Sequence, residues 1–202
     1  MRRTFILSVS AVVMIYAATT AAQIAFPPPL PPPIPLSLNG TYGFTGTTAC
    51  LYSPAGFNSG FQPLGNNWSS SFAFEGTWTF NPTGTGTAKG SNLGIGVPPT
   101  PGFSPGASSS NHSYAFTYNV YPDGSFTVDM VPGTFQGTAL TGGRAGQTWT
   151  VQNAPRFTGL ISRNGNTLTA ATLTPPTVQT STYSNGDILQ QICHSSRVFV
   201  KM

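Results

Sequence analysis

The sequence predicts an all-β protein: an antiparallel meander of about 8–10 strands, closed or nearly closed into a barrel, with no significant helix after the leader. From residue 38 onward, apolar and polar side chains alternate with the period of two that is typical of strands. Charged residues make up only 6% of the chain, which disfavours exposed helices built from Glu, Lys and Arg. Asn-Gly and Asp-Gly pairs separate the alternating segments, as in tight hairpins.

The order of segments predicts an exported protein. Residues 1–22 have the pattern of a secretory signal peptide, with Arg2 and Arg3 before an apolar stretch and small residues at its end. That apolar stretch is shorter than the roughly 20 residues that span a bilayer, so no membrane span is expected in the mature chain. Residues 23–37 form a proline-rich spacer with polyproline II geometry. The β-barrel domain is expected over residues 38–202, in the periplasm or outside the cell.

The charge pattern argues against nucleic acid as a partner. The chain has eight basic and four acidic residues, and two of the basic residues lie in the leader. The others are scattered along the barrel domain, whereas nucleic-acid binding needs a basic stripe or patch.

Nine strands are expected, near 40–52, 69–80, 84–93, 112–121, 124–138, 147–162, 166–174, 178–184 and 187–201. An odd number conflicts with an up-and-down barrel, whose strand number is even. We therefore expect one miscounted segment within 132–155, where Pro132, Gly142 and Pro155 interrupt the alternation.

Turns and long loops divide the strands. Asn81–Gly84, Pro122–Gly124, Arg163–Gly165 and Ser184–Gly186 have the residues that tight hairpin turns require. Two longer connections, 53–67 and 94–110, are expected to be either functional or mobile.

The only two cysteines, Cys50 and Cys193, predict one disulfide that joins the first strand of the domain to the last. Closing a loop of this length contributes roughly 4–5 kcal/mol in the chain-entropy model. Counting alternate residues places the two cysteines on opposite faces of their strands. A β-bulge near Gly46 or near Ser195 is therefore expected.

An aromatic face runs through several of the expected strands. If the barrel is narrow, this face fills it; if the barrel is wider, the same face lines a cavity for a small apolar ligand. His194 counts onto the apolar face of the last strand, as a polar group in a ligand cavity or as a histidine bonded within the sheet, whereas His112 is expected to be solvated at a loop edge. The candidate ligand-facing residues are Tyr42, Phe44, Phe72, Phe74, Trp78, Phe116, Tyr118 and His194.

No catalytic, metal-binding or cofactor motif is present in the sequence. The four acidic residues form no close pair, and there is no GxSxG, HExxH, HxH or GxGxxG pattern. We therefore expect neither enzymatic activity nor a metal or cofactor.

Gly76-Thr77-Trp78, followed by a strand, a tight turn and further meander, resembles the Gly-x-Trp motif of the calycin barrels, the lipocalins and avidins. Those families carry the motif on the first strand, where this chain has Gly40-Thr41-Tyr42 instead. The resemblance covers the architecture of residues 38–202 and implies no ligand residues. The pattern is also similar to uncharacterised exported bacterial proteins, which implies no function.

The leading hypothesis is an exported, disulfide-closed barrel that binds a small apolar ligand. The alternative is a structural or surface-interaction module, similar to an adhesin, that acts through its long loops. A further alternative is an outer-membrane barrel with the aromatic face turned to lipid. The sequence gives no indication of the oligomeric state.

Overall fold

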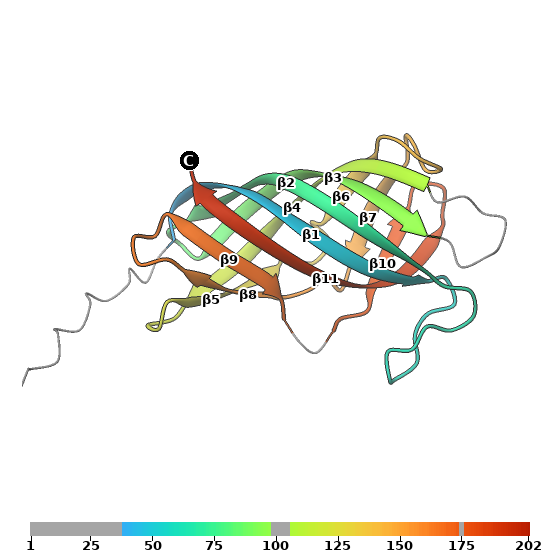
Figure 1. Cartoon of the computed structure of the whole chain (residues 1–202), viewed down its shortest axis with the longest axis horizontal. Coiled ribbons are helices and arrows are strands. Elements are labelled where there is room, and N and C mark those ends of the chain that lie inside the picture. Colours follow the sequence, from blue (N-terminus) through green and yellow to red (C-terminus); the bar gives the residue numbers. More distant parts are fainter. Residues whose placement is uncertain (1–37, 98–105, 174–175) are drawn as a thin grey trace, which may run out of the picture. The chain divides into compact units, whose positions relative to one another are not determined.

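The computed structural model describes residues 38–97, 106–173 and 176–202 (Figure 1). The predicted signal peptide (1–22) and spacer (23–37) lie outside this range and stay predictions. The described residues contain no helix, and so none that is long and apolar enough to cross a membrane. Their strands are β1 (Gly40–Ser53), β2 (Trp68–Asn81), β3 (Thr85–Val97), β4 (Gly106–Val120), β5 (Ser125–Met130), β6 (Gln136–Ala139), β7 (Thr148–Gln152), β8 (Phe157–Ile161), β9 (Thr167–Thr172), β10 (Gln179–Tyr183) and β11 (Ile188–Lys201).

All the strands belong to one antiparallel sheet that closes on itself. Strands β1, β2, β3, β4, β5, β8, β9 and β11 pair in that order, and β11 pairs with β1 to complete a ring of eight. The all-β, barrel-like prediction is therefore confirmed.

The three remaining strands complete the wall at the other end of the barrel. β6 pairs with β4, β7 with β6, β10 with β7, and β11 with β10. Figure 1 shows β5, β8 and β9 toward one end of the five long strands and β6, β7 and β10 toward the other. Three positions of the ring are thus each occupied by two short strands, one at each end.

Proline-containing segments interrupt these three positions. β5 and β6 are separated by 131–135, β7 and β8 by 153–156, and β9 and β10 by 173–178. Proline has no N–H to donate to a ladder, so a strand breaks where it occurs. Backbone bonds persist across the breaks, from Val151 N–H to the Phe135 carbonyl and from Leu173 N–H to the Arg156 carbonyl, both 2.8 Å.

The ring of eight resolves the odd strand count. The expected strands 124–138 and 147–162 each correspond to one ring position, although each is broken in two. The expected miscount near 132–155 is therefore present, because four strands lie where two were expected. A second miscount arose at 173–178, where the expected strands 166–174 and 178–184 share a single ring position as β9 and β10.

Aromatic side chains fill one half of the barrel. At the β5, β8 and β9 end, Trp78 is fully buried and its ring centroid lies 4.8 Å from that of Phe199 and 5.0 Å from that of Phe116. Leu38 is buried at this end, where its carbonyl accepts a 2.6 Å hydrogen bond from the Tyr118 hydroxyl. The aromatic face points inward, opposite to the orientation that a lipid-facing barrel would need. The buried core comprises Leu38, Tyr42, Phe44, Phe74, Trp78, Phe80, Ala88, Tyr114, Phe116, Tyr118, Phe126, Val128, Met130, Phe157, Ile161, Leu168, Ala170 and Phe199.

The first and last strands are joined by the predicted disulfide. Cys50 and Cys193 are direct partners in the β1–β11 ladder and form an S–S bond of 2.04 Å. The ladder runs without a break from Tyr42 opposite Lys201 to Ser53 opposite Gln190, so the expected bulge is absent. A buried disulfide of this kind indicates an oxidising, exported environment.

The assignment of faces on β11 was wrong. Ile188, Val198 and Val200 are 62%, 49% and 57% exposed and lie on the outer face, whereas Phe199 is fully buried. Cys193 shares the inward face with Phe199, which is why no bulge is needed to bring it opposite Cys50.

The four predicted turns are present, each with a glycine at positive φ: Gly84, Gly124, Gly165 and Gly186.

The expected loop 94–110 is largely strand, because β3 continues to Val97 and β4 starts at Gly106. Residues 98–105 lie outside the described residues. The connection after Ser53 is a true loop. The Ser53 hydroxyl fixes it by donating a 2.7 Å hydrogen bond to the Leu64 carbonyl.

Candidate functional site

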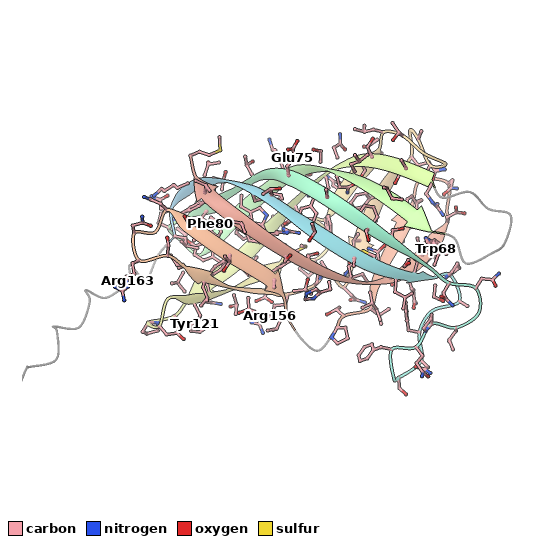
Figure 2. The ribbon with its side chains drawn as sticks, viewed as in Figure 1. Trp68, Glu75, Phe80, Tyr121, Arg156 and Arg163 are labelled. Atoms are coloured by element: carbon pink, nitrogen blue, oxygen red, sulfur yellow. A yellow bond between two sulfur atoms is a disulfide. The ribbon has the colours of Figure 1, made fainter. Side chains whose placement is uncertain are left out.

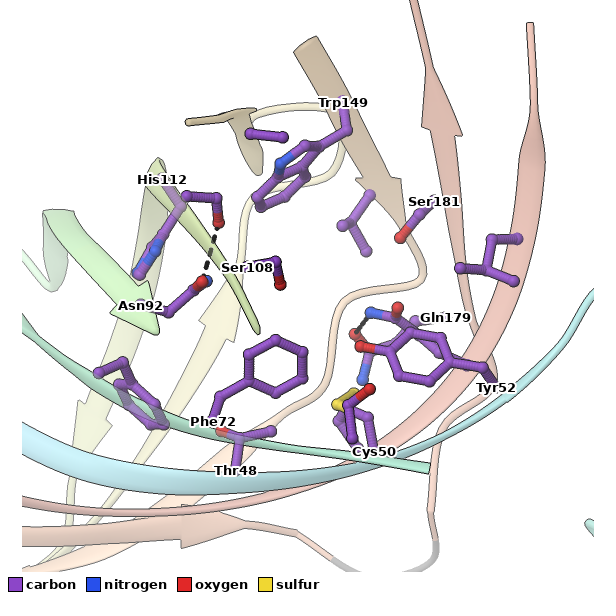
Figure 3. A pocket seen from close by; sticks show the side chains of 18 of the residues that line it. Thr48, Cys50, Tyr52, Phe72, Asn92, Ser108, His112, Trp149, Gln179 and Ser181 are labelled. Atoms are coloured by element: carbon purple, nitrogen blue, oxygen red, sulfur yellow. Dashed lines mark hydrogen bonds between the residues drawn. A yellow bond between two sulfur atoms is a disulfide. The ribbon is translucent and has the colours of Figure 1, made fainter. Parts of the chain in front are cut away.

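The half of the barrel enclosed by β6, β7 and β10 contains a cavity of about 600 Å³ (Figure 3). The long strands continue from the packed half into this half, but their inward side chains become smaller and more polar. On β11, for example, Phe199 belongs to the core, whereas Arg197, Ser195 and Gln191 line the cavity. The barrel is therefore filled at one end, whereas the other end contains this cavity beside a second buried cluster of Cys50, Tyr52, Leu189 and Cys193.

Aromatic side chains form one part of the cavity wall. Phe72 and Phe74 project from β2, Phe135 precedes β6, and Trp149 projects from β7. The Phe135 and Trp149 ring centroids lie 5.3 Å apart in an edge-on contact. In Figure 3 the labelled rings of Phe72 and Trp149 lie on different sides of the same space. Flat apolar surfaces of this kind suit an apolar ligand.

Hydroxyl and amide groups form the rest of the wall. Strand β4 contributes three consecutive serines, of which Ser110 donates a 3.0 Å hydrogen bond to Asn92 Oδ1. On β10, Gln179 is 2% exposed; its Oε1 accepts a 3.2 Å hydrogen bond from Gln191 Nε2, and its own Nε2 has no partner among the described residues. An unpaired buried donor is costly, so this group is suited to an acceptor atom on a bound molecule.

Arg197 lies at the boundary between the cavity and the packed core. Its side chain is 8% exposed, and its guanidinium carbon lies 4.4 Å from the ring centroid of Phe157, 4.7 Å from that of Phe74 and 5.2 Å from that of Trp78. Nη1 donates a 2.6 Å hydrogen bond to the Tyr114 hydroxyl, whereas Nε has no partner among the described residues. A buried cation thus lies within a group of aromatic rings.

No carboxylate neutralises this cation. Asp129 pairs with Arg156 at 2.9 Å and Asp187 with Arg144 at 2.8 Å. The other two acidic side chains, Glu75 and Asp123, are exposed, and no described acidic residue lies within ion-pair distance of Arg197. Cation–π attraction of about 2 kcal/mol compensates part of the desolvation that burial imposes on the guanidinium.

Two titratable groups border Arg197. Burial, with a further contribution from the Arg197 charge, lowers the pKa of His112 to about 4, so its imidazole is neutral at pH 7. Burial raises the pKa of Tyr114, although the charge and hydrogen bond of Arg197 act in the opposite direction. At neutral pH the guanidinium is therefore the charged group at the floor of the cavity.

The open end of the cavity carries an exposed ion pair. Arg144, in the turn between β6 and β7, forms a 2.8 Å bond to Asp187 and places its guanidinium 3.9 Å from the Tyr183 ring centroid. Tyr52 and Trp68 stack nearby with their ring centroids 5.3 Å apart. Arg144, Tyr52, Trp68 and Tyr183 line this end of the cavity.

The structure divides the predicted ligand-facing residues into three groups. Phe72 and Phe74 line the cavity, as does the disulfide. His194 shares its face of β11 with Val198 and Val200, as expected, but this face is the outer one, so His194 is exposed and does not face the cavity. The remaining five belong to the packed core: Tyr42, Phe44, Trp78, Phe116 and Tyr118.

Several cavity residues escaped the sequence analysis. His112, expected to be solvated, lines the cavity from β4, and neither Arg197, Gln179 nor Trp149 was singled out. One signal was present in the sequence: Arg197 is two residues from Phe199 and four from Cys193, so it shares their face of the strand, and no other residue of that face within 189–199 is charged.

Comparisons with protein-family models, with curated proteins and with solved structures found no match. The structure supports the barrel architecture on which the calycin resemblance rests. Among the described residues, no group of three or more His, Cys, Asp or Glu side chains could hold a metal ion.

Proposed function

We propose that this protein is an exported binding protein that holds a small, largely apolar molecule inside its barrel. The observation that carries this proposal is the contrast between the two halves of one continuous sheet. The half with β5, β8 and β9 is filled by aromatic rings, and the half with β6, β7 and β10 contains a cavity of about 600 Å³ that is open to solvent on one side. Ligand sites in proteins have volumes of roughly 300–1,000 Å³ and mainly apolar walls.

The wall composition supports uptake of an organic molecule. Phe72, Phe135 and Trp149 offer apolar surface, and Gln179 offers a polar contact that would fix the orientation of a ligand. The disulfide ties the two strands that close the ring and itself forms part of the cavity wall. The cavity is thus built into a covalently closed frame.

The proposal can be tested with N-phenyl-1-naphthylamine, a neutral dye that fluoresces in apolar surroundings. We expect the dye to bind the wild-type protein at a stoichiometry near one. Ser181→Trp places a bulky ring in the cavity and should weaken binding about 10-fold or more. Thr182→Trp is the matched control, because adjacent strand residues point to opposite faces. Wild-type protein without dye binding, or equal effects of both variants, would refute the proposal.

A surface-interaction module is the second candidate function. The loop between β1 and β2 supports it, because Phe61 lies there with φ of 60° and is 39% exposed. A bulky residue with positive φ is an outlier that other contacts must hold in place. Here Asn58 and Gln62 hold the loop through a 2.9 Å side-chain hydrogen bond.

Replacing residues 54–67 with a short Gly-Ser linker tests this second candidate. A surface module would lose attachment to cells or matrix while keeping dye binding in the cavity. Unchanged attachment would exclude this loop as the interaction site.

A further inference from the structure

We propose that the ligand is an apolar carboxylate, and that Arg197 binds the carboxylate at the floor of the cavity. This inference rests on the proposed binding function and specifies the chemistry of the ligand. Arg197 provides the one buried cation that lines the cavity in the described part of the chain, since Arg144 lies at the exposed entrance.

The first argument is that donors at the cavity floor outnumber acceptors. A guanidinium has five N–H donors. Among the described residues, one of the five has an acceptor, the Tyr114 hydroxyl, and Nε is buried without one. Trp78 Nε1 is also buried and makes no hydrogen bond of good geometry, although it lies close enough to the Tyr114 hydroxyl to lower the pKa of that group. Carboxylate oxygens only accept hydrogen bonds, so they match this donor set.

The second argument concerns charge. The chain has four acidic residues; two are paired with other arginines, and the other two are exposed away from Arg197. Isolated buried charges are costly, and proteins therefore pair them. Aromatic rings compensate part of this cost but accept no conventional hydrogen bond. A ligand carboxylate would supply the missing counter-charge.

The third argument is the position of Arg197 along the cavity. It lies next to the packed core, and successive inward residues of β11 toward the entrance are Ser195, Cys193, Gln191 and Leu189. Eight residues of strand correspond to about 26 Å along β11. A ligand with its carboxylate at Arg197 would therefore extend its apolar body toward Phe72 and Trp149.

The neighbours of Arg197 favour an anion over a cation or a neutral group. His112 is uncharged at neutral pH, and the Tyr114 hydroxyl accepts a hydrogen bond from Arg197, which leaves its own proton available to a second acceptor. A carboxylate would thus meet one positive charge and two kinds of donor, with no negative group nearby.

The test compares two probes that differ only in the head group. Dodecanoate and dodecan-1-ol are titrated separately, below their aggregation concentrations, as competitors of bound N-phenyl-1-naphthylamine at pH 7.5. We expect dodecanoate to bind wild-type protein at least 10-fold more tightly than the alcohol. Arg197→Met should remove this preference, so that the acid and the alcohol compete about equally with the dye. Arg163→Met removes the same charge from an exposed turn (Figure 2) and should preserve the preference.

A second measurement needs only wild-type protein. The pKa of His112, followed by NMR, should rise when dodecanoate is bound and stay near 4 with dodecan-1-ol, because only the carboxylate offsets the Arg197 charge. Equal affinities for the two probes with no change at His112 would overturn the carboxylate proposal and leave the binding function standing. Failure of the dye and of both probes to bind would overturn the binding function itself.

Discussion

The disulfide allows the closure of the barrel to be tested quantitatively. Cys50 and Cys193 lie within the ladder that joins the first strand to the last, and their sulfurs are buried. The double variant Cys50→Ala/Cys193→Ala removes the bond and leaves the hydrogen bonds of the β1–β11 ladder available. We therefore expect the variant to keep the fold and lose stability.

The size of the loss follows from the length of chain that the disulfide closes. The two cysteines are 143 residues apart. The chain-entropy relation then gives about 17 cal/mol/K, or about 5 kcal/mol at 25 °C. Residual structure in the unfolded chain reduces this value, so we expect a loss of about 3–5 kcal/mol.

Urea denaturation followed by circular dichroism measures this loss. With an m-value of about 2 kcal/mol/M, a loss of 3–5 kcal/mol lowers the midpoint by about 1.5–2.5 M. His194→Ala is the matched control, because it alters the exposed neighbour of Cys193 and should change stability by less than about 0.5 kcal/mol. A double variant that loses less than about 1 kcal/mol would refute the view that the disulfide constrains the closure of the ring.

Three further predictions concern the pH response, strand packing and the closed end of the barrel. The unfolded chain takes up a proton at His112 below pH 6.5, whereas the folded protein does so only near pH 4. The free energy of unfolding should therefore fall by at most about 3 kcal/mol as the pH is lowered from 6.5 to 4. In urea titrations at several pH values, His112→Gln should lose this component, and an unchanged dependence of stability on pH would contradict it. A Cβ at Gly159 would overlap the Thr169 carbonyl and lie 2.6 Å from the Phe126 ring. Gly159→Ala should therefore lower the free energy of unfolding by about 1–3 kcal/mol, measured by thermal unfolding. The control Gly143→Ala places its Cβ in open space and should lower it by less than about 0.5 kcal/mol. Tyr118→Phe removes the hydroxyl that lies 2.6 Å from both the Leu38 and the Asn81 carbonyls and should cost about 1–3 kcal/mol, with faster amide exchange at the start of β1 and the end of β2. Equal exchange in both proteins would count against that role.

The sequence was most informative where the barrel is packed. Phe44, Trp78 and Phe116 alternate with polar residues, and this contrast identified the inward faces of β1, β2 and β4 correctly. Turn residues placed the hairpins equally well, because a glycine at positive φ is a local requirement. The alternation of apolar and polar residues and the turn glycines both depend on residues close together in the chain, so a single sequence is enough to identify them.

The same reasoning failed on β11 for a reason connected with the site. The rule that apolar residues point inward assumes a packed interior, but the inward face of β11 borders the cavity. Beside the cavity its inward residues are Ser195 and Arg197, whereas at the packed end Phe199 points inward and its apolar neighbours Val198 and Val200 lie on the outer face. A strand that breaks the local rule coincides here with the candidate binding site, as expected where function competes with packing.

The remaining cavity residues depended on long-range arrangement. His112 begins the expected strand 112–121, but the serine-rich residues around it show no alternation of polarity, so no periodic signal showed that its side chain faces the interior. The interruptions near Pro132 and Pro155 were visible in the sequence. Their consequence, two short strands sharing one position of the ring, depends on pairing with β4 and β11.

The most direct test of the account is a crystal structure of the protein with dodecanoate bound. We expect the alkyl chain in the cavity between Phe72 and Trp149, with a carboxylate oxygen within hydrogen-bond distance of the Arg197 guanidinium. A ligand bound on the outer surface, or an interior filled by side chains in both halves of the barrel, would contradict the account.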